Sequence, residues 1–491
     1  MTHKRKYILH ALVIIASAVI VVSCKIGHHY TRPDVELPVS LTEEESADSA
    51  SFADRSWTEI YTDSILQNLI NKALTYNKDM LMAAARIKEL AAMKRIDYAK
   101  MFPSLDLRVY GEKEQDNYGG DNPSDDNQFD LKANIAWEVD LWGKLRWNHE
   151  ASTAEFMASI ENRRALQMSL IAQVAQAYYE LVALDNELSI VRQTVTARRE
   201  SEHLARIRYE GGLTSEVTYR QAQVELSKTA TLLPDLERQI TSKENEIAFL
   251  TGDFRFKSAQ FAKNSEHHIA RATVPQEVSL PDSLPVGLPS SLLERRPDVR
   301  EAEQKLIAAN ASVGAAYTSM FPNITLTASL GAESEELKDL LSSPYHLISV
   351  NLLQPVFAMG KNRARHKAAK AAYERAVYAY EKTVLSAFRD AFDAIANFNK
   401  IKEIYQTRYH LESSSKTALS LALVQYVNGA IGYMDLLDAQ RTYLDAQISL
   451  SNALLDSQLA TVNLYKALGG GWERSGSGTS KNNESGQDNG K

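Results

Sequence analysis

Apolar and polar residues alternate with a period of two through residues 129–141. The odd-numbered positions of this segment are all apolar: Phe129, Leu131, Ala133, Ile135, Trp137, Val139 and Leu141. The same alternation runs through residues 104–110 and 323–330, and in a weaker form through residues 346–357. Such alternation predicts β-strands with one apolar and one polar face, which we place at about 103–114, 129–142, 322–333 and 346–357.

The predicted strands fit two environments. Each is close to the 9–11 residues that a tilted transmembrane strand requires. A soluble sheet with one face on a core shows the same alternation, so the pattern by itself leaves both environments open.

Two segments predict α-helices of unusual length. Residues 143–209 and 360–426 contain no proline and no internal glycine, and they are rich in good helix formers. A helix of this size extends roughly 100 Å. Gly211 and Gly212 follow the first segment and Gly429 follows the second, as expected for left-handed helix ends. We expect these glycines to form turns into return helices, the first of which Pro234 kinks or divides.

The chain contains two copies of one structural half. Landmarks of the first half return in the same order and at nearly the same spacing in the second. They are Phe102-Pro103 with Phe321-Pro322, Gly143-Lys144 with Gly360-Lys361, Tyr209 with Tyr426, and Ala222-Gln223 with Ala439-Gln440. We place the first repeat at 61–252, a linker at 253–288 and the second repeat at 289–470. A unit of this length is not a solenoid repeat, whose period is about 20–50 residues.

The start of the chain has the layout of an export signal. A basic stretch at 4–6 precedes an apolar run at 11–22, which is too short for a comfortable membrane-spanning helix. Cys24 follows directly and is the only cysteine, so it forms no disulfide within the chain. We expect a signal peptide at 1–23. A plain signal peptide with an incidental cysteine is the alternative to a lipid attachment site.

Composition narrows the function further. The net charge of −7 gives no basic footprint for nucleic acid, and the mean hydropathy is −0.31. No run of 18 apolar residues follows the signal, so a membrane crossing requires a β-barrel. Four strands cannot close one, which makes oligomerisation necessary. Residues 471–491 are rich in Ser, Gly, Asn and charge, which predicts a disordered tail.

Catalytic and metal-binding patterns are weak. The histidine pairs at 28–29 and 267–268 have no cysteine or carboxylate at metal-ligand spacing. No glycine-rich phosphate loop follows a strand. We therefore predict that the chain is not an enzyme, with no catalytic residue, no metal site and no cofactor.

Taken together, these features resemble the TolC-like outer-membrane efflux factors, and their NodT-like lipoprotein branch most of all. The resemblance covers nearly all of the mature chain. The motifs that carry it are Leu-Glu-Arg-Arg-Pro-Asp-Val at 293–299, Phe-Pro at 102–103 and 321–322, Gly-Lys at 143–144 and 360–361, Leu-Leu-Asp-Ala-Gln-Arg at 436–441 and Leu-Gly-Gly-Gly-Trp at 468–472.

The resemblance implies a mainly α fold with a membrane β-barrel. Three chains would form a homotrimeric 12-stranded barrel joined to a periplasmic α-helical tube. The function implied is a passive duct of a tripartite efflux system. Its partners would be a periplasmic adaptor protein and an inner-membrane pump of the RND type. A duct for type I protein secretion and a structural periplasmic coiled-coil lipoprotein are the alternatives.

The resemblance also assigns residues. It implies cleavage before Cys24, a covalent lipid on that cysteine, and a lipidated segment at 24–60. The residue after it is Lys25 and not Asp, which favours sorting to the outer membrane. The chain would then be lipid-anchored in the outer membrane with a periplasmic extension.

The periplasmic aperture of the family lies at the helix tips, and it matches residues 426–440 here. Asp435 and Asp438 would place two carboxylates from each subunit near the pore axis, because positions i and i+3 share one helix face. Some members hold the tip closed with an arginine and an acid, where this chain has Ile431 and Thr218. Without that lock, closure must rest on other contacts, for which Tyr426 and Tyr433 are the candidates.

Overall fold

The computed structural model describes residues 25–35, 52–116, 124–254, 269–272, 289–355 and 357–472 of the chain. The predicted signal peptide, Cys24, most of the predicted linker and the tail after residue 472 lie outside the described residues. The chain divides into two compact units. Unit 1 contains described residues of 25–35, 83–162 and 298–384, and unit 2 contains those of 52–82, 163–297 and 385–472.

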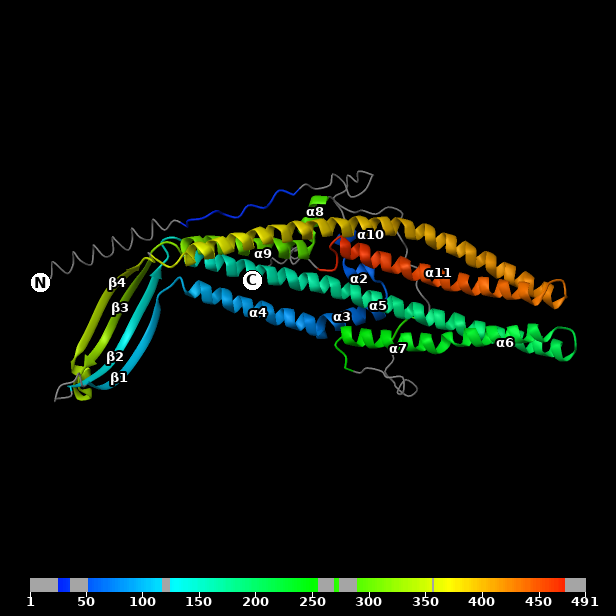
Figure 1. The fold of residues 1–491 in the computed structure, drawn as a ribbon, viewed down its shortest axis with the longest axis horizontal. Coiled ribbons are helices and arrows are strands. Elements are labelled where there is room, and N and C mark those ends of the chain that lie inside the picture. Colours follow the sequence, from blue (N-terminus) through cyan, green and yellow to red (C-terminus); the bar gives the residue numbers. More distant parts are fainter. Residues whose placement is uncertain are drawn as a thin grey trace, which may run out of the picture. The chain divides into compact units, whose positions relative to one another are not determined.

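Unit 1 carries a four-stranded antiparallel sheet in the order β1-β2-β3-β4 (Figure 1). The strands are β1 (Ser104–Asp116), β2 (Ser124–Val139), β3 (Asn323–Ser334) and β4 (Pro344–Leu353). Each repeat supplies one hairpin, and the pairing of β2 with β3 joins the two repeats in the sheet. Strands β1 and β4 are the edges, and among the described residues neither has a partner strand on its outer side.

The register gives the sheet one apolar and one polar face. A row of apolar residues crosses all four strands through Leu105, Ile135, Ala328 and Ile348. Leu105 and Ile348 are exposed, at 70% and 77% of their surface. On the other face Lys132 lies 2.8 Å from Glu333 and 3.5 Å from Asp130. The alternation in the sequence is therefore present in all four strands.

Several strand boundaries differ from the positions expected from the sequence, and strand β2 begins at Ser124 and not at about 129. Strand β2 ends at Val139 and not at 142, because the Asp140 side chain binds the first turn of α5, which begins at Lys144, instead of continuing the strand. Its carboxylate accepts the backbone N–H groups of Leu145 and Arg146 at 3.1 and 3.0 Å. Strand β4 ends at Leu353 and not at 357, just before Pro355, which has no N–H to donate to a sheet.

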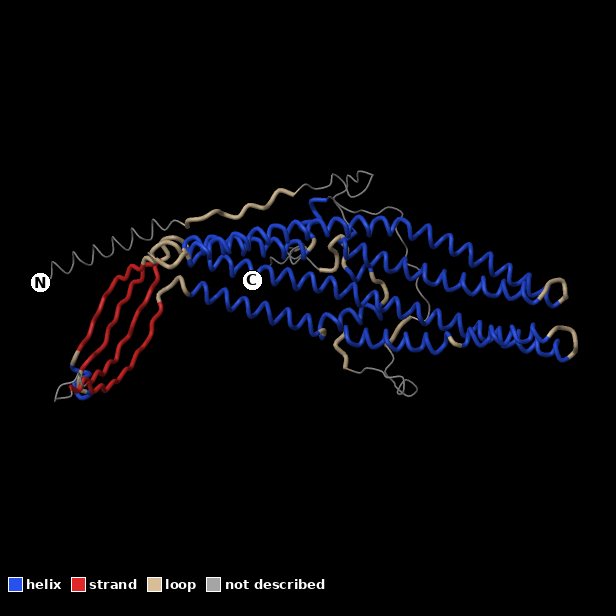
Figure 2. The backbone as a smooth tube through the Cα atoms, viewed as in Figure 1, coloured by secondary structure: helices blue, strands red, loops and turns tan. Residues whose placement is uncertain are grey.

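Helices make up most of the remaining described chain (Figure 2). The α-helices are α2 (Trp57–Ile60), α3 (Ser64–Tyr76), α4 (Lys78–Ala99), α5 (Lys144–Glu210), α6 (Glu216–Ala230), α7 (Leu232–Leu250), α8 (Pro289–Arg295), α9 (Pro297–Thr318), α10 (Lys361–Val427) and α11 (Tyr433–Ala467). Two short 3₁₀ helices are η1 (Phe52–Asp54) and η2 (Leu337–Ser342). Helices α5 and α10 have 67 residues each. None of the described helices has the length and apolar character needed to span a membrane.

The first return helix is divided into two helices close to Pro234, as the sequence predicted. Helix α6 ends at Ala230 and α7 begins at Leu232, with Thr231 between them. Pro234 lies in the first turn of α7, where the backbone N–H groups have no partner inside the helix. The second return helix has no such proline and forms the single helix α11.

Unit 2 has a core of aromatic and aliphatic side chains. The ring of Tyr465 on α11 meets the rings of Phe52 and Tyr61 edge-on, with centroids 6.0 and 6.2 Å apart. The motif at 293–299 contributes a buried arginine to unit 2. Its Arg296 is buried and donates to the backbone oxygens of Ala387 and Ala467, each at 3.4 Å.

Candidate functional site

The predicted turns close the two helical hairpins of unit 2, and both lie at the same end of that unit (Figure 2). Gly212 and Gly429 have φ angles of +72° and +75°, a conformation that a residue with a side chain adopts only with strain. Leu213 N–H donates to the oxygen of Arg208, and Ala430 N–H to that of Gln425, both at 2.8 Å. These bonds satisfy carbonyl groups at the helix ends. Gly211 precedes Gly212 with an ordinary negative φ.

The two candidate tyrosines are part of an apolar cluster behind the turns. Tyr426 and Tyr433 are buried and meet edge-on, with ring centroids 5.8 Å apart. They pack with residues of α5, α6 and α11, namely Ala205, Ala222, Leu436 and Leu437. Burial raises the pKa of Tyr433 to about 12, so its hydroxyl stays protonated at neutral pH. Helices α5, α6, α10 and α11 thus meet in one core at the tips.

Asp435 and Asp438 lie on the exposed surface of α11 in the first turns of that helix. One oxygen of Asp435 accepts the backbone N–H of Gly432 at 3.0 Å. This bond caps the start of α11, a structural role that sequence reasoning missed. Asp438 lies one turn before Arg441 and within its electrostatic reach.

The positions of the missing lock hold no ion pair. The Ile431 side chain packs against the apolar cluster at the tip. Thr218 shares a hydrogen bond with the hydroxyl of Ser215, 3.3 Å away, inside its own helix turn. Both residues therefore make local contacts at the tip and form no ion pair between helices.

A buried ionic cluster joins three helices close to this tip, and sequence reasoning missed it. Glu225 on α6 binds Arg198 on α5, with 3.0 Å between Nη1 and a carboxylate oxygen, and its other oxygen binds Arg441 on α11. The hydrogen bond from Arg441 holds the pKa of the Glu225 carboxyl below its ordinary value. The only signal in the sequence was the place of Arg441 at the end of the motif at 436–441.

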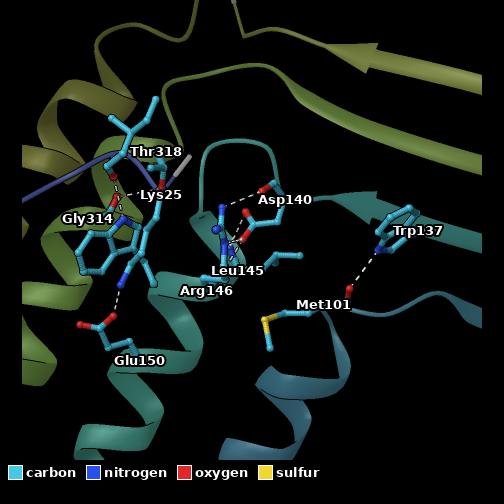
Figure 3. A network of polar contacts seen from close by, with 11 residues as sticks. Lys25, Met101, Trp137, Asp140, Leu145, Arg146, Glu150, Gly314 and Thr318 are labelled. Atoms are coloured by element: carbon cyan, nitrogen blue, oxygen red, sulfur yellow. Dashed lines mark hydrogen bonds and ion pairs between the residues drawn. The ribbon is translucent and has the colours of Figure 1, made fainter. Parts of the chain in front are cut away.

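The residues that follow Cys24 form an ordered strap on unit 1, which we call the N-terminal strap (residues 25–35). Trp147 of α5 is completely buried and donates its indole N–H to the oxygen of Ile26 at 2.8 Å. Lys25 places its ammonium group 3.4 Å from the centre of the indole ring and binds Glu150. Figure 3 shows the Lys25 side chain pointing toward Glu150.

Two glycines make room for the Trp147 ring. A Cβ atom at Gly27 or Gly314 would lie 2.7 or 2.5 Å from ring atoms, closer than real Cβ contacts allow. Further along the strap, Arg32 binds Glu303 of α9 at 2.6 Å. The strap therefore contacts helices of both repeats within unit 1.

Metal ligation finds no support in the described part of the chain. Among residues placed there, no group of three His, Cys, Asp or Glu side chains could hold an ion. The pair at 267–268 lies outside the described residues, and His29 packs its ring 5.9 Å from that of Trp147.

Comparison with known proteins places this arrangement in a family. The model of the family "Outer membrane efflux protein" matches residues 69–253 and 288–470, and each matched segment contains one strand hairpin and one 67-residue helix. The chain is 29% identical to the probable outer membrane lipoprotein SilC of Salmonella typhimurium, over 94% of this chain and 98% of that protein. It is 32% identical to the solvent efflux pump outer membrane protein SrpC of Pseudomonas putida, over 84% and 87%.

A solved structure shows the same fold. The outer membrane channel MtrE of Neisseria gonorrhoeae, solved in its open state, superposes with a TM-score of 0.78 at 28% identity. The match covers 91% of this chain and 98% of that one. The predicted fold class, mainly α with two repeats of a strand hairpin and long and short helices, is confirmed. The chain therefore belongs to the outer membrane efflux protein family, and it serves in efflux at the outer membrane and not as an enzyme.

Proposed function

We propose that this chain forms a passive trimeric duct across the outer membrane and the periplasm. The observation that carries the proposal is the sheet of unit 1, which has an exposed apolar face and two unpaired edges. Unpaired strand edges are not tolerated in lipid, so β1 of one copy must pair with β4 of the next. Three copies joined in this way close the sheet with the apolar rows toward lipid.

The helices extend the duct into the periplasm. They end in the two tips of unit 2, where the carboxylates of Asp435 and Asp438 are exposed next to the apolar cluster. We assign the periplasmic aperture to these acids together with Tyr426, Tyr433 and the turns at Gly211-Gly212 and Gly429. A periplasmic adaptor and an inner-membrane pump, of the RND type, deliver the cargo there.

Small molecules are the proposed cargo. The related proteins include the solvent efflux pump protein SrpC and the cation efflux system protein CusC of Escherichia coli. Because these relatives belong to systems for solvents and for cations, the duct itself does not choose between such classes of cargo in this proposal, although its acidic aperture favours cations over anions. The pump and adaptor determine which molecule is exported.

The duct is tested by reconstituting the purified full-length protein in planar bilayers. We expect trimers in chemical cross-linking and small, cation-selective single-channel currents. The protein should also fractionate with outer membranes and resist extraction until detergent is added. A well-folded monomer that carbonate or urea extracts without detergent would contradict the proposal.

Cys24 is the proposed lipid attachment site, with cleavage before it. The SilC relative is described as a lipoprotein, which supports this assignment. We expect Cys24→Ser to abolish incorporation of labelled palmitate, because the thiol and the new amino group are the acylated atoms. The sheet should still insert, so the variant stays in the membrane fraction with weaker anchoring. A folded Cys24→Ser protein that is fully soluble would count against membrane insertion of the sheet.

A further inference from the structure

The two strand hairpins of unit 1 are equivalent in structure as well as in sequence. The Phe-Pro and Gly-Lys landmarks define which residue of the second repeat is the counterpart of each residue of the first. Ser104 pairs with Ala136 in the first hairpin. Their counterparts Asn323 and Leu353 pair with each other in the second hairpin. The two hairpins therefore have the same register.

The hairpins are also anchored to the preceding helices in the same way. The indole N–H of Trp137 donates to the backbone oxygen of Met101 at 3.0 Å (Figure 3). Gln354, the counterpart of Trp137, donates its amide N–H to the oxygen of Met320 at 3.3 Å. Met320 is in turn the counterpart of Met101. A contact in one repeat thus returns in the other at the matching residues.

A further contact joins the two repeats at the repeat seam, by which we mean the pairing of β2 with β3. The ring of Trp142 stacks on that of Phe321, with centroids 5.1 Å apart. The indole N–H also donates to the backbone oxygen of Pro322 at 2.9 Å. The end of the first hairpin is therefore packed against the start of the second.

The matching residues at the two edge strands are exposed. Met359 is the counterpart of Trp142 and follows β4, and 86% of its surface is exposed. Phe102 is the counterpart of Phe321 and precedes β1, and 52% of its surface is exposed. In the described part of the chain, Met359 is also the only residue other than glycine with a positive φ, +47°. Such a conformation costs free energy and persists only where the surroundings hold it.

We propose that Met359 of one copy packs against Phe102 of the next copy, as Trp142 packs against its partner ring within one chain. This inference rests on the proposed function, in which β4 of one copy pairs with β1 of the next, a pairing that we call the subunit seam. The partner is a second copy of this chain, because Phe102 matches the ring that Trp142 contacts. A thioether packs well on an aromatic ring but donates no hydrogen bond, so this contact is weaker than the one at the repeat seam.

The equivalence of the repeats also assigns the register of the subunit seam. At the repeat seam Asn134 pairs with Ser329, and their side chains share a hydrogen bond of 2.7 Å. The counterparts of these two residues are Asn351 and Tyr110. We therefore place Asn351 of one copy directly opposite Tyr110 of the next. This register keeps the apolar rows of β1 and β4 on the same face of the sheet.

The contact is tested with Met359→Gly in the full-length protein. Glycine adopts a positive φ without strain, so the trimer would become no weaker if Met359 only formed a turn. We expect the opposite, because the substitution removes a packed methionine side chain from every subunit seam. Trimers purified in detergent should dissociate at a protein concentration about tenfold higher or more than the wild type. The measurement is analytical ultracentrifugation over a dilution series.

Leu341→Gly is the matched control. Leu341 is also 86% exposed, but it lies on η2, which packs against β2 and β3. Its loss should leave dissociation unchanged. Phe102→Ala should weaken the trimer as Met359→Gly does, and the double variant should be no weaker than either single variant. An equal effect in Leu341→Gly, or trimers of wild-type or higher stability in Met359→Gly, would overturn the contact and leave the duct standing.

Pairs of cysteines test the register independently. Oxidation of the variant with Asn351→Cys and Tyr110→Cys should link copies covalently, because residues directly opposite each other lie within the Cα distance of a disulfide, about 4.4–6.8 Å. Arg108→Cys or Glu112→Cys in place of Tyr110→Cys should give no link, since each is two positions away along β1. The single-cysteine variants show whether Cys24 takes part.

The outcomes separate the seam from the duct. Trimers that link through Arg108→Cys or Glu112→Cys, and not through Tyr110→Cys, would contradict the register and leave the proposed function standing. A folded wild-type protein that is monomeric at every concentration would contradict the subunit seam and the duct together.

Discussion

Trp147→Ala is expected to destabilise unit 1 by about 3–5 kcal/mol, the usual cost of removing a fully buried tryptophan. The indole is completely buried and fills a space that Gly27 and Gly314 leave open. Its removal also takes away the hydrogen bond to Ile26 and the aromatic face under Lys25. We therefore expect the N-terminal strap to leave the helices that it joins.

The measurement combines thermal unfolding with limited trypsin digestion of the purified protein. Trypsin should cleave after Lys25 in Trp147→Ala and not in the wild type, because a protease needs a mobile backbone. Gly314→Val should have the same effect, because the new side chain would occupy space that the ring fills. Tyr378→Ala is the control, since this ring on α10 is 60% exposed and its loss removes no core. Protection of Lys25 in Trp147→Ala would contradict the role of the ring.

The strap has a consequence for the proposed lipid anchor. Lys25 follows Cys24 directly, and Ile26 donates its backbone N–H to the oxygen of Trp142 at 3.2 Å. Trp142 lies between the end of β2 and the start of α5. Lys25, the residue that follows the proposed lipid attachment site, is therefore held close to the end of the sheet.

Features with a local cause were open to prediction from the sequence. The ends of α5 and α10 follow from the glycines after them, because glycine adopts the left-handed conformation without strain. In the structure Gly212 and Gly429 have this conformation. The seam between α6 and α7 follows from Pro234. The faces of the sheet follow from alternation, because the side chains of a strand point in opposite directions at successive residues. Each of these signals lies within a few residues of its effect.

Features that depend on distant partners were not open to prediction. Glu225 is 27 residues from Arg198 and 216 residues from Arg441, and no periodic pattern connects them. The strap has the same character, because Lys25 meets Glu150 across 125 residues. The end of β2 was misplaced for a different, local reason. Apolar Leu141 continues the alternation, but Asp140 accepts the backbone N–H groups of Leu145 and Arg146 at the start of α5, and these bonds end the strand.

Replacing both Asp435 and Asp438 with asparagine is expected to lower the preference of the open duct for cations over anions by about fivefold or more. A carboxylate about 4 Å from a passing ion changes its free energy by about 1 kcal/mol even in water, and three copies of the chain supply each acid. Asparagine keeps an oxygen that can accept the N–H of Gly432, so the cap of α11 persists. The measurement is the reversal potential of planar bilayers under a salt gradient.

Asp456→Asn is the control, because this carboxylate lies on α11 and is 50% exposed but is far from the tip in sequence. A reversal potential that is the same in the wild type and in the double variant would place the constriction elsewhere. The single variants should also differ. Arg441 partly offsets the field of Asp438, whereas no lysine or arginine follows Asp435 within one turn. Asp435→Asn should therefore cause the larger loss of cation preference, and in a variant without Arg441 the two losses should become equal.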